Sequence, residues 1–149
     1  MRVMLVFGPN YGAYAALKSF LNAKDKRHSF SIVLLSDHTP ADKKLGRKWC
    51  REMHVPFRWH RAEWGAASVL IANRKRDTEM LDVGKPDHVY TFMGVSAHAG
   101  KRFWEVLEMV RWRNIPMTHF HASAGRGGKL AGPKELPDEQ FRARYEPIE

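Results

Sequence analysis

Cysteine is almost absent from this chain of 149 residues: Cys50 stands alone, so no disulfide can form within the chain. A lone cysteine suits a reducing compartment, and we expect a cytoplasmic protein. Long apolar runs are missing as well, and none reaches the roughly 18 residues that a membrane-spanning helix needs. Because the chain opens directly on a strand pattern, we expect no signal peptide.

Acidic residues are scarce relative to basic ones, 16 against 25, which gives a formal net charge of +9. This excess favours anionic partners, namely nucleotides, nucleic acid or an acidic protein surface, and does not by itself choose among them. Hydrophobic residues make up 44% of the chain. That content is typical of a globular protein rather than a disordered one, and the length predicts a single domain.

Several motifs of phosphate, metal and nucleophilic chemistry are also missing. The chain has neither a G-x-G-x-x-G pattern nor a Walker A pattern. His119 and His121 share one face of a predicted strand, but two histidines without a nearby cysteine or carboxylate pattern are a poor zinc signature. Adjacent Asp37 and His38 do not make a triad, because triads are assembled in space. We expect no metal and no cofactor, and we favour binding without catalysis while leaving an enzymatic role open.

Apolar runs rich in β-formers alternate with helical patterns through residues 1–120. The predicted strands cover residues 2–7, 30–35, 55–59, 88–92 and 114–120. The predicted helices cover residues 11–22, 39–53, 66–83 and 98–113. This order predicts an α/β fold of the Rossmann-like type, with a five-stranded parallel sheet in the order 3-2-1-4-5 and helices on both faces.

Two of the predicted strands end at a glycine. Gly8, Pro9 and Asn10 follow the first strand, and residues 94–100 follow the fourth. If these strands are neighbours, their loops form the two sides of the crevice at which open α/β sheets bind ligands. Glycine lets backbone N–H groups approach a phosphate, and a helix N-terminus adds positive potential. The alternative is an ordinary strand-to-helix turn at each place.

The helical pattern of residues 66–83 carries polar side chains on its buried face. Asn73 and Arg76 fall on the same face as the apolar Met80. A buried arginine needs an anionic partner. We therefore weigh a ligand contact and a structural ion pair equally for Arg76. Glu79, near Arg76, is a weak candidate for a catalytic carboxylate.

Residues 121–149 break the alternation and are predicted to form a C-terminal tail outside the domain of residues 1–120. The tail begins with a basic segment containing glycine and proline, and Phe141 and Tyr145 are apolar anchors near its end. It could pack on the domain, bind a partner or be disordered. Elsewhere, basic residues form the outer face of the second predicted helix and could meet nucleic-acid phosphates. They are Lys43, Lys44, Arg47, Lys48 and Arg51.

Several segments of residues 1–120 together carry a family pattern. Residues 1–8 match its opening strand, and residues 74–81, Arg-Lys-Arg-Asp-Thr-Glu-Met-Leu, stand where it has R-N-x-x-M-L. Residues 84–92, Gly-Lys-Pro-Asp-His-Val-Tyr-Thr-Phe, match its fourth strand, and residues 113–117 match its A-G-I-P-V segment. In these features the chain resembles the SLOG superfamily, Rossmann-like proteins related to the Smf/DprA and LOG (Lonely Guy) groups. The small stand-alone members of bacteria and their phages are the most similar.

The resemblance implies a nucleotide or nucleotide-derived ligand in the crevice described above. Some members of the family cleave a base from its ribose phosphate, and others act as ligand sensors; self-association is common among them, which implies that this chain can form a homo-oligomer. The site residues carried over by position are Gly8, Pro9, Asn10, Asp37, His38, Asp42, Arg76, Asp77, Gly94, Val95, Ser96 and Gly100. Asn73 joins them from the helical pattern.

The loops that would face phosphate depart from the family pattern. Gly8-Pro9-Asn10 stands for Gly-Ser-Arg, and Pro9 cannot donate a backbone hydrogen bond. Val95 stands in place of a glycine. Three hypotheses follow. The leading one is a non-catalytic protein that senses or sequesters a nucleotide-like ligand. The alternatives are a repurposed scaffold that binds protein or nucleic acid, and a nucleotide-processing hydrolase of the LOG type.

Overall fold

The computed structural model describes the whole chain except residues 10, 64, 66–67, 95–99, 125–129 and 147–149, and for residues 122–124 and 130–134 it describes the backbone alone. The strands are β1 Arg2–Phe7, β2 Ile32–Ser36, β3 Phe57–His60, β4 His88–Met93, β5 Met117–Ala124 and β6 Leu130–Pro137. The helices are α1 Tyr14–His28, the π-helical turn η1 Asp42–Gly46, α2 Arg47–Glu52, α3 Val69–Asp82, α4 Lys101–Trp112 and α5 Asp138–Tyr145.

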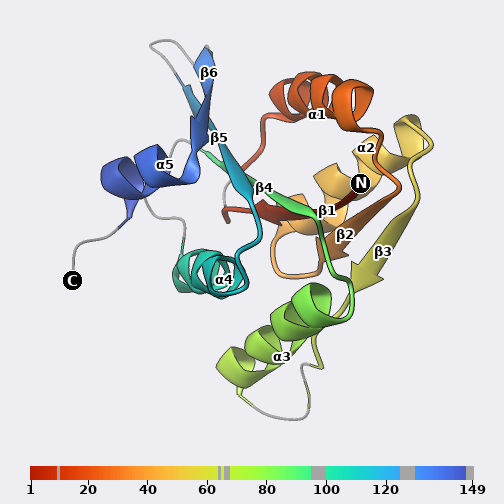
Figure 1. The fold of residues 1–149 in the computed structure, drawn as a ribbon, viewed down its shortest axis with the longest axis vertical. Helices are drawn as coiled ribbons and strands as arrows, with labels where there is room; N and C mark the ends of the chain where they lie inside the picture. The colour runs from red at the N-terminus through yellow and green to blue at the C-terminus, as the bar shows by residue number, and fades with distance from the viewer. Residues whose placement is uncertain (10, 64, 66–67, 95–99, 125–129, 147–149) are drawn as a thin grey trace.

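The six strands form one sheet in the order β3-β2-β1-β4-β5-β6 (Figure 1). Strands β1 to β5 run parallel, and β6 pairs antiparallel with β5. The α/β class and the predominantly parallel sheet are confirmed. The strand count is wrong, since the sequence predicted five strands, and the order gains β6 at the edge beyond β5.

The physical reason for the missed strand lies in its composition. Residues 130–137, Leu-Ala-Gly-Pro-Lys-Glu-Leu-Pro, contain two prolines and no β-branched residue. Proline cannot donate to a ladder and is confined to edge strands, which is the place that β6 takes. Pairing with β5 therefore decides the conformation of this segment, and its own β-propensity does not.

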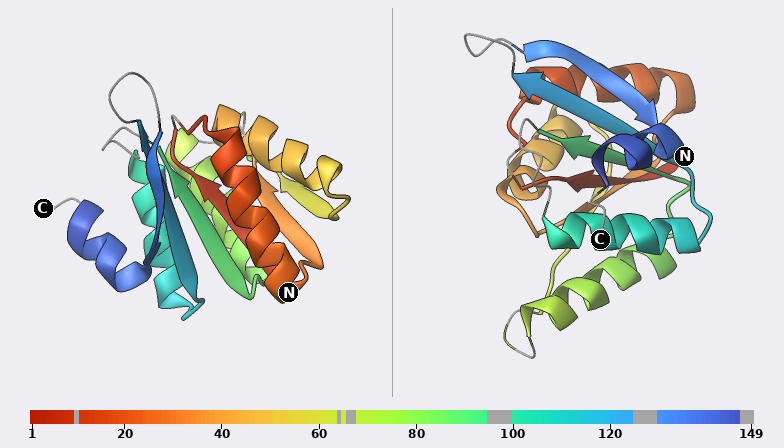
Figure 2. Two further views of the ribbon diagram at one scale, coloured as in Figure 1. Left: turned by 90° about the horizontal axis from the view of Figure 1, so that it is seen from above. Right: turned by 90° about the vertical axis from the view of Figure 1, so that its left-hand side faces the viewer.

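Two apolar layers hold helices on opposite faces of the sheet (Figure 2). On one face, Leu17 and Leu21 of α1 and Trp49 of α2 pack on side chains such as Leu5. On the other face lie α3, α4 and α5, and their shared layer includes Met80, Phe103 and Phe141. Burial of such side chains is the main force that holds the layers together.

The helix bounds differ from the sequence expectation, most of all at the end of α1 and at the starts of α3 and α4. Helix α1 continues to His28 through the polar stretch that was predicted to be a connection. Exposed polar residues there are good helix formers and lie on the solvent side, so the apolar pattern ends before the helix does. Helices α3 and α4 begin at Val69 and Lys101; the earlier starts predicted for them fall on residues outside the described ranges.

The C-terminal segment packs on the domain. The sequence had left open whether it would do so, bind a partner or be disordered. Phe141 of α5 is fully buried and stacks with His119 of β5, with ring centroids 4.0 Å apart. Tyr145 packs against the same layer. Within the described ranges, no helix is both long and apolar enough to cross a membrane.

The order of the strands creates a switch point between β1 and β4. From β1 the chain covers one face with α1 and α2 while it builds β2 and β3. It then crosses to the other face through α3 and returns as β4 on the opposite side of β1. Connections that leave neighbouring strands toward opposite faces open a crevice at the carboxyl ends of those strands.

Candidate functional site

The loops after β1 and β4 lie side by side at the switch point. The N–H of Gly8 donates a hydrogen bond of 2.8 Å to the carbonyl oxygen of Phe92. Gly100 has φ of +84°, a conformation that favours glycine, and a Cβ added to it would lie 3.9 Å from Cγ of Pro9. Gly94 directly follows β4. The structure thus brings Gly8, Pro9, Gly94 and Gly100 to the carboxyl edge, while Asn10, Val95 and Ser96 lie outside the described residues.

Five charged side chains are buried between β2, α3 and α4 close to this edge. Each of these residues is exposed by 7% or less. They are Asp37, Asp42, Arg76, Asp77 and Arg102. We call this set the buried charge cluster. Four of its five members were among the residues predicted from the sequence. The five come from three separate segments, namely the residues after β2, helix α3 and helix α4, and the fold brings them together.

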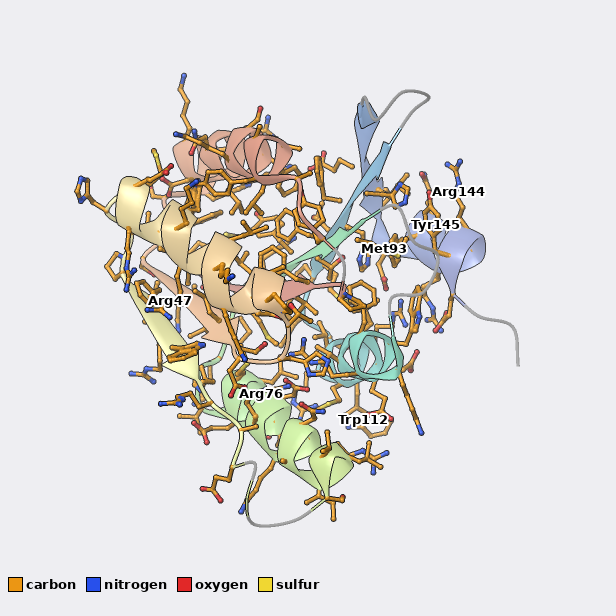
Figure 3. The ribbon with its side chains drawn as sticks, turned by 180° about the vertical axis from the view of Figure 1, so that it is seen from behind. Arg47, Arg76, Met93, Trp112, Arg144 and Tyr145 are labelled. Carbon is orange, nitrogen blue, oxygen red and sulfur yellow. The ribbon has the colours of Figure 1, made fainter. Side chains whose placement is uncertain are left out.

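Arg76 points inward from α3 (Figure 3) and joins two aspartates of the cluster. Its Nη1 donates to Oδ1 of Asp37 at 2.8 Å, and its Nε donates to Oδ1 of Asp77 at 3.2 Å. The exposed fraction of the Arg76 side chain is 1%. Of the two roles weighed for this arginine, the ion pair is present, and the guanidinium does not reach the surface.

Arg102 is the member that sequence reasoning missed. Its Nε and Nη2 donate to the two carboxylate oxygens of Asp77 at 3.1 and 2.7 Å. Its Nη1 is buried and has no hydrogen-bond partner among the described residues. The signal was available, because Arg102, Val106 and Val110 are spaced four residues apart and share the buried face of α4.

Arg102 and Asp77 stabilise each other in their charged forms. Burial acts to raise the pKa of Asp77, but the guanidinium charges of Arg102 and Arg76 outweigh it and lower that pKa. Burial likewise acts to lower the pKa of Arg102, and the Asp77 carboxylate reverses this. Both partners therefore remain ionised. The pKa of Asp42 is instead raised, because its burial dominates over the nearby Arg102 charge.

Local hydrogen bonds fix the two other aspartates. Asp37 directly follows β2, and both of its carboxylate oxygens accept from the N–H of Ala62 at 3.2 Å. Asp42 and Thr39 form a reciprocal capping arrangement. The N–H of Asp42 donates to Thr39 Oγ1 at 3.1 Å, and the N–H of Thr39 donates to Asp42 Oδ2 at 3.1 Å.

His38 lies half-buried beside the cluster. Its Nδ1 is 3.2 Å from Oδ1 of buried Asn73, so the ring donates from Nδ1 and keeps its lone pair on Nε2. Burial and then the neighbouring charges of Arg102 and Arg76 lower the pKa of His38 to about 4. At neutral pH the ring is uncharged and can accept a hydrogen bond.

Glu79 faces a different part of the molecule. Its Oε1 is 3.1 Å from Nδ1 of buried His60, which ends β3. Glu79 also lines a hollow of about 180 Å³ together with the basic residues Arg61 and Lys75. Arg76 contributes to this hollow as well. The carboxylate is thus placed beside β3 rather than above β1 and β4.

The two histidines of β5 face α5. His119 is fully buried between Thr91, 2.6 Å away through Nδ1, and Asp138, 2.7 Å away through Nε2. His121 stacks on Tyr145 with ring centroids 4.9 Å apart. In the part of the chain that the structure describes, no group of three or more histidine, cysteine, aspartate or glutamate residues is arranged to hold a metal ion.

No protein-family model matches the chain, and no curated protein matches it either.

Proposed function

We propose that this protein binds a nucleotide or nucleotide-derived ligand at the carboxyl edge of the sheet, above β1 and β4. The observation that carries the proposal is the buried charge cluster, which gathers beside the switch point and not in another part of the fold. Burying charges is costly unless each is paired. Strongly shifted charged groups beside a crevice indicate a functional site.

Three features suit an anionic ligand there. Helix α4 begins at Lys101, so the N–H groups of its first turn and an exposed ammonium lie at the edge of the site. Arg102 follows with a guanidinium group that is not fully hydrogen-bonded among the described residues. Neutral His38 offers an acceptor for an amino or hydroxyl group. The resemblance of residues 1–120 to the SLOG superfamily supports the same ligand class.

We assign this binding a sensing or sequestering role without catalysis. Glu79, the carboxylate considered for a hydrolase, is hydrogen-bonded to His60 and lines the hollow beside β3. The buried aspartates of the cluster are held by arginines and by backbone N–H groups. A cytoplasmic location belongs to the proposal, since a chain with a single cysteine suits a reducing compartment.

A thermal-shift screen of mononucleotides, dinucleotides and cyclic nucleotides tests the proposal. A ligand present at a hundred times its dissociation constant stabilises the folded state by about 2.7 kcal/mol. We expect the variant Lys101→Glu to weaken binding of the hit, because it reverses the charge at the start of α4. Arg76→Ala is unsuitable, since it would remove a buried ion pair from each of two buried aspartates and so weaken the fold itself.

The matched control is Lys26→Glu, which makes the same change in charge at an exposed position in the last turn of α1. It should bind as the unaltered protein does. No stabilisation by any nucleotide, with the protein folded, would refute the proposal. Equal loss in both variants would show that the effect is one of net charge and not of the crevice.

A further inference from the structure

A second group of charged residues lies along the outside of α2 and the edge strand β3, and unlike the buried charge cluster it is largely exposed and entirely basic. It carries basic side chains at five helical positions and at two positions on or just after β3. They are Lys43, Lys44, Arg47, Lys48, Arg51, Arg58 and Arg61. We call this set the α2–β3 basic surface. The five helical residues line a shallow hollow of about 400 Å³ together with Glu52.

The basic groups of this surface are not neutralised by the fold. Within the described ranges, none of its seven members forms an ion pair. Two arginines of α4 and its C-terminal end are paired instead: Arg111 pairs with Asp138 at 2.9 Å, and Arg113 pairs with Asp82 at 2.7 Å. The α2–β3 edge therefore presents seven basic groups whose charge no ion pair of the described residues offsets.

Trp59 of β3 holds two of the guanidinium groups in place. Cζ of Arg47 lies 4.9 Å from the centroid of the Trp59 ring, and Cζ of Arg61 lies 4.8 Å from it. The indole is itself fixed, because its Nε1 donates to the carbonyl oxygen of Ser36 at 3.2 Å. An arginine stacked on an aromatic ring keeps N–H groups at its edge for a phosphate, and less side-chain entropy is lost on binding.

The helical positions gather their charge on one face. Lys43 and Lys44 lie in the π-helical turn η1, and Arg47, Lys48 and Arg51 lie in α2. All five line the same hollow, and such a group of neighbouring cations suits a polymer that carries one negative charge on every unit. Figure 3 shows Arg47 on the side of the molecule away from Arg144 and Tyr145 of α5.

We infer that the α2–β3 basic surface binds the phosphate backbone of a nucleic acid without reading its sequence. Phosphate contacts from lysine and arginine supply most of the affinity of such binding. An acidic protein is a poorer fit, because protein interfaces have an apolar centre with few charges. Here the described side chains are charged, and the Trp59 ring lies under two guanidinium groups. The inference uses none of the residues of the crevice.

Fluorescence anisotropy with a short mixed-sequence DNA duplex tests this inference. The probe should bind the unaltered protein at about 50 mM salt and weaken steeply toward 200 mM. In the variant Lys44→Glu/Lys48→Glu we expect affinity to fall at least tenfold. The slope of log K against log salt should become shallower by about 1.8, since two phosphate contacts are lost at about 0.9 each.

The matched control is Arg27→Glu/Arg144→Glu, which changes the net charge equally at exposed positions of α1 and α5. Its affinity should stay within about twofold of the unaltered protein. Lack of binding by the unaltered protein at low salt would overturn the inference. So would an equal loss in the control, or equal binding of polyglutamate. A nucleotide hit in the thermal-shift screen is unaffected by any of these results, so the two proposals fail separately.

Discussion

Asp37 and Arg76 are 39 residues apart in the chain and form an ion pair of 2.8 Å in which the side chains are 5% and 1% exposed. The pair joins the end of β2 to the middle of α3. Asp77, the next residue along α3, connects the same arginine to Arg102 of α4. One continuous set of charges thus links a strand end and two helices at the carboxyl edge of the sheet.

Replacing Asp77 with asparagine should destabilise the protein strongly. The change deprives the buried guanidinium group of Arg102 of its ion-pair partner and removes one of the two carboxylates that Arg76 contacts. Breaking a buried pair in this way costs about 3–5 kcal/mol. Urea denaturation followed by circular dichroism measures the free energy of unfolding. Asp82→Asn is the control, because the Asp82–Arg113 pair is largely exposed and should cost about 1 kcal/mol or less; equal losses in the two variants would contradict the role assigned to Asp77.

Three histidines should make stability depend on pH in mildly acidic solution. Burial is the main cause that lowers the pKa of His38, His88 and His119 to about 4 in the folded protein. In the unfolded chain a histidine titrates near 6.5, so between these values the unfolded state binds more protons. The free energy of unfolding should therefore fall as pH is lowered from about 6.5 to about 4.

Two measurements check this pH dependence. The ring C–H signals in NMR spectra should titrate with midpoints near 4 for these three histidines, and midpoints near 6.5 would contradict the structure. Denaturation curves across the same range should show the loss of stability directly. Below pH 4 the lowered pKa of Asp77 adds a further loss, because that carboxylate is stabilised in its charged form and becomes protonated.

Gly84 should not tolerate a side chain, although its backbone is not left-handed. A Cβ at this position would lie 2.5 Å from Cδ1 of Leu34 and against the carbonyl oxygen of Met80. Since the backbone oxygen cannot move aside alone, we expect Gly84→Ala to cost about 1–3 kcal/mol. Gly12→Ala is the matched control, because nothing lies within 4 Å of its added Cβ. Its urea midpoint should stay the same or rise slightly.

Phe141 should be essential to the stability of the whole domain, although it lies beyond residue 120. It is fully buried and contacts Phe103 and His119 across the sheet layer. Phe141→Ala should cost about 3–5 kcal/mol in urea denaturation. Trp112→Ala removes an even larger aromatic side chain that is 86% exposed, and should change stability by no more than about 0.5 kcal/mol. If the C-terminal segment contributed nothing to the core, the free energy of unfolding would change little in either variant.

Sequence reasoning singled out Asn73 and Arg76 by a local signal, because they interrupt the apolar face of a helix pattern. Asp37, His38, Asp42 and Asp77 were named by position from the resemblance to the SLOG superfamily. Sequence reasoning could not assign their partners. The interaction of Arg76 with Asp37 depends on where α3 packs over β2, and Arg102 was passed over although it shares a face with Val106 and Val110.

The sequence by itself determined the alternation of strands and helices, since hydrophobic periodicity is a property of neighbouring residues. It also determined the parallel part of the sheet and the excess of positive charge. Only the tertiary structure decided that residues 130–137 become β6, because that strand exists through pairing with β5 and not through its own propensity. Only packing decided which charges are buried in pairs at Asp77 and which form no ion pair with a described residue along the α2–β3 basic surface, because burial and pairing depend on segments far apart in the chain.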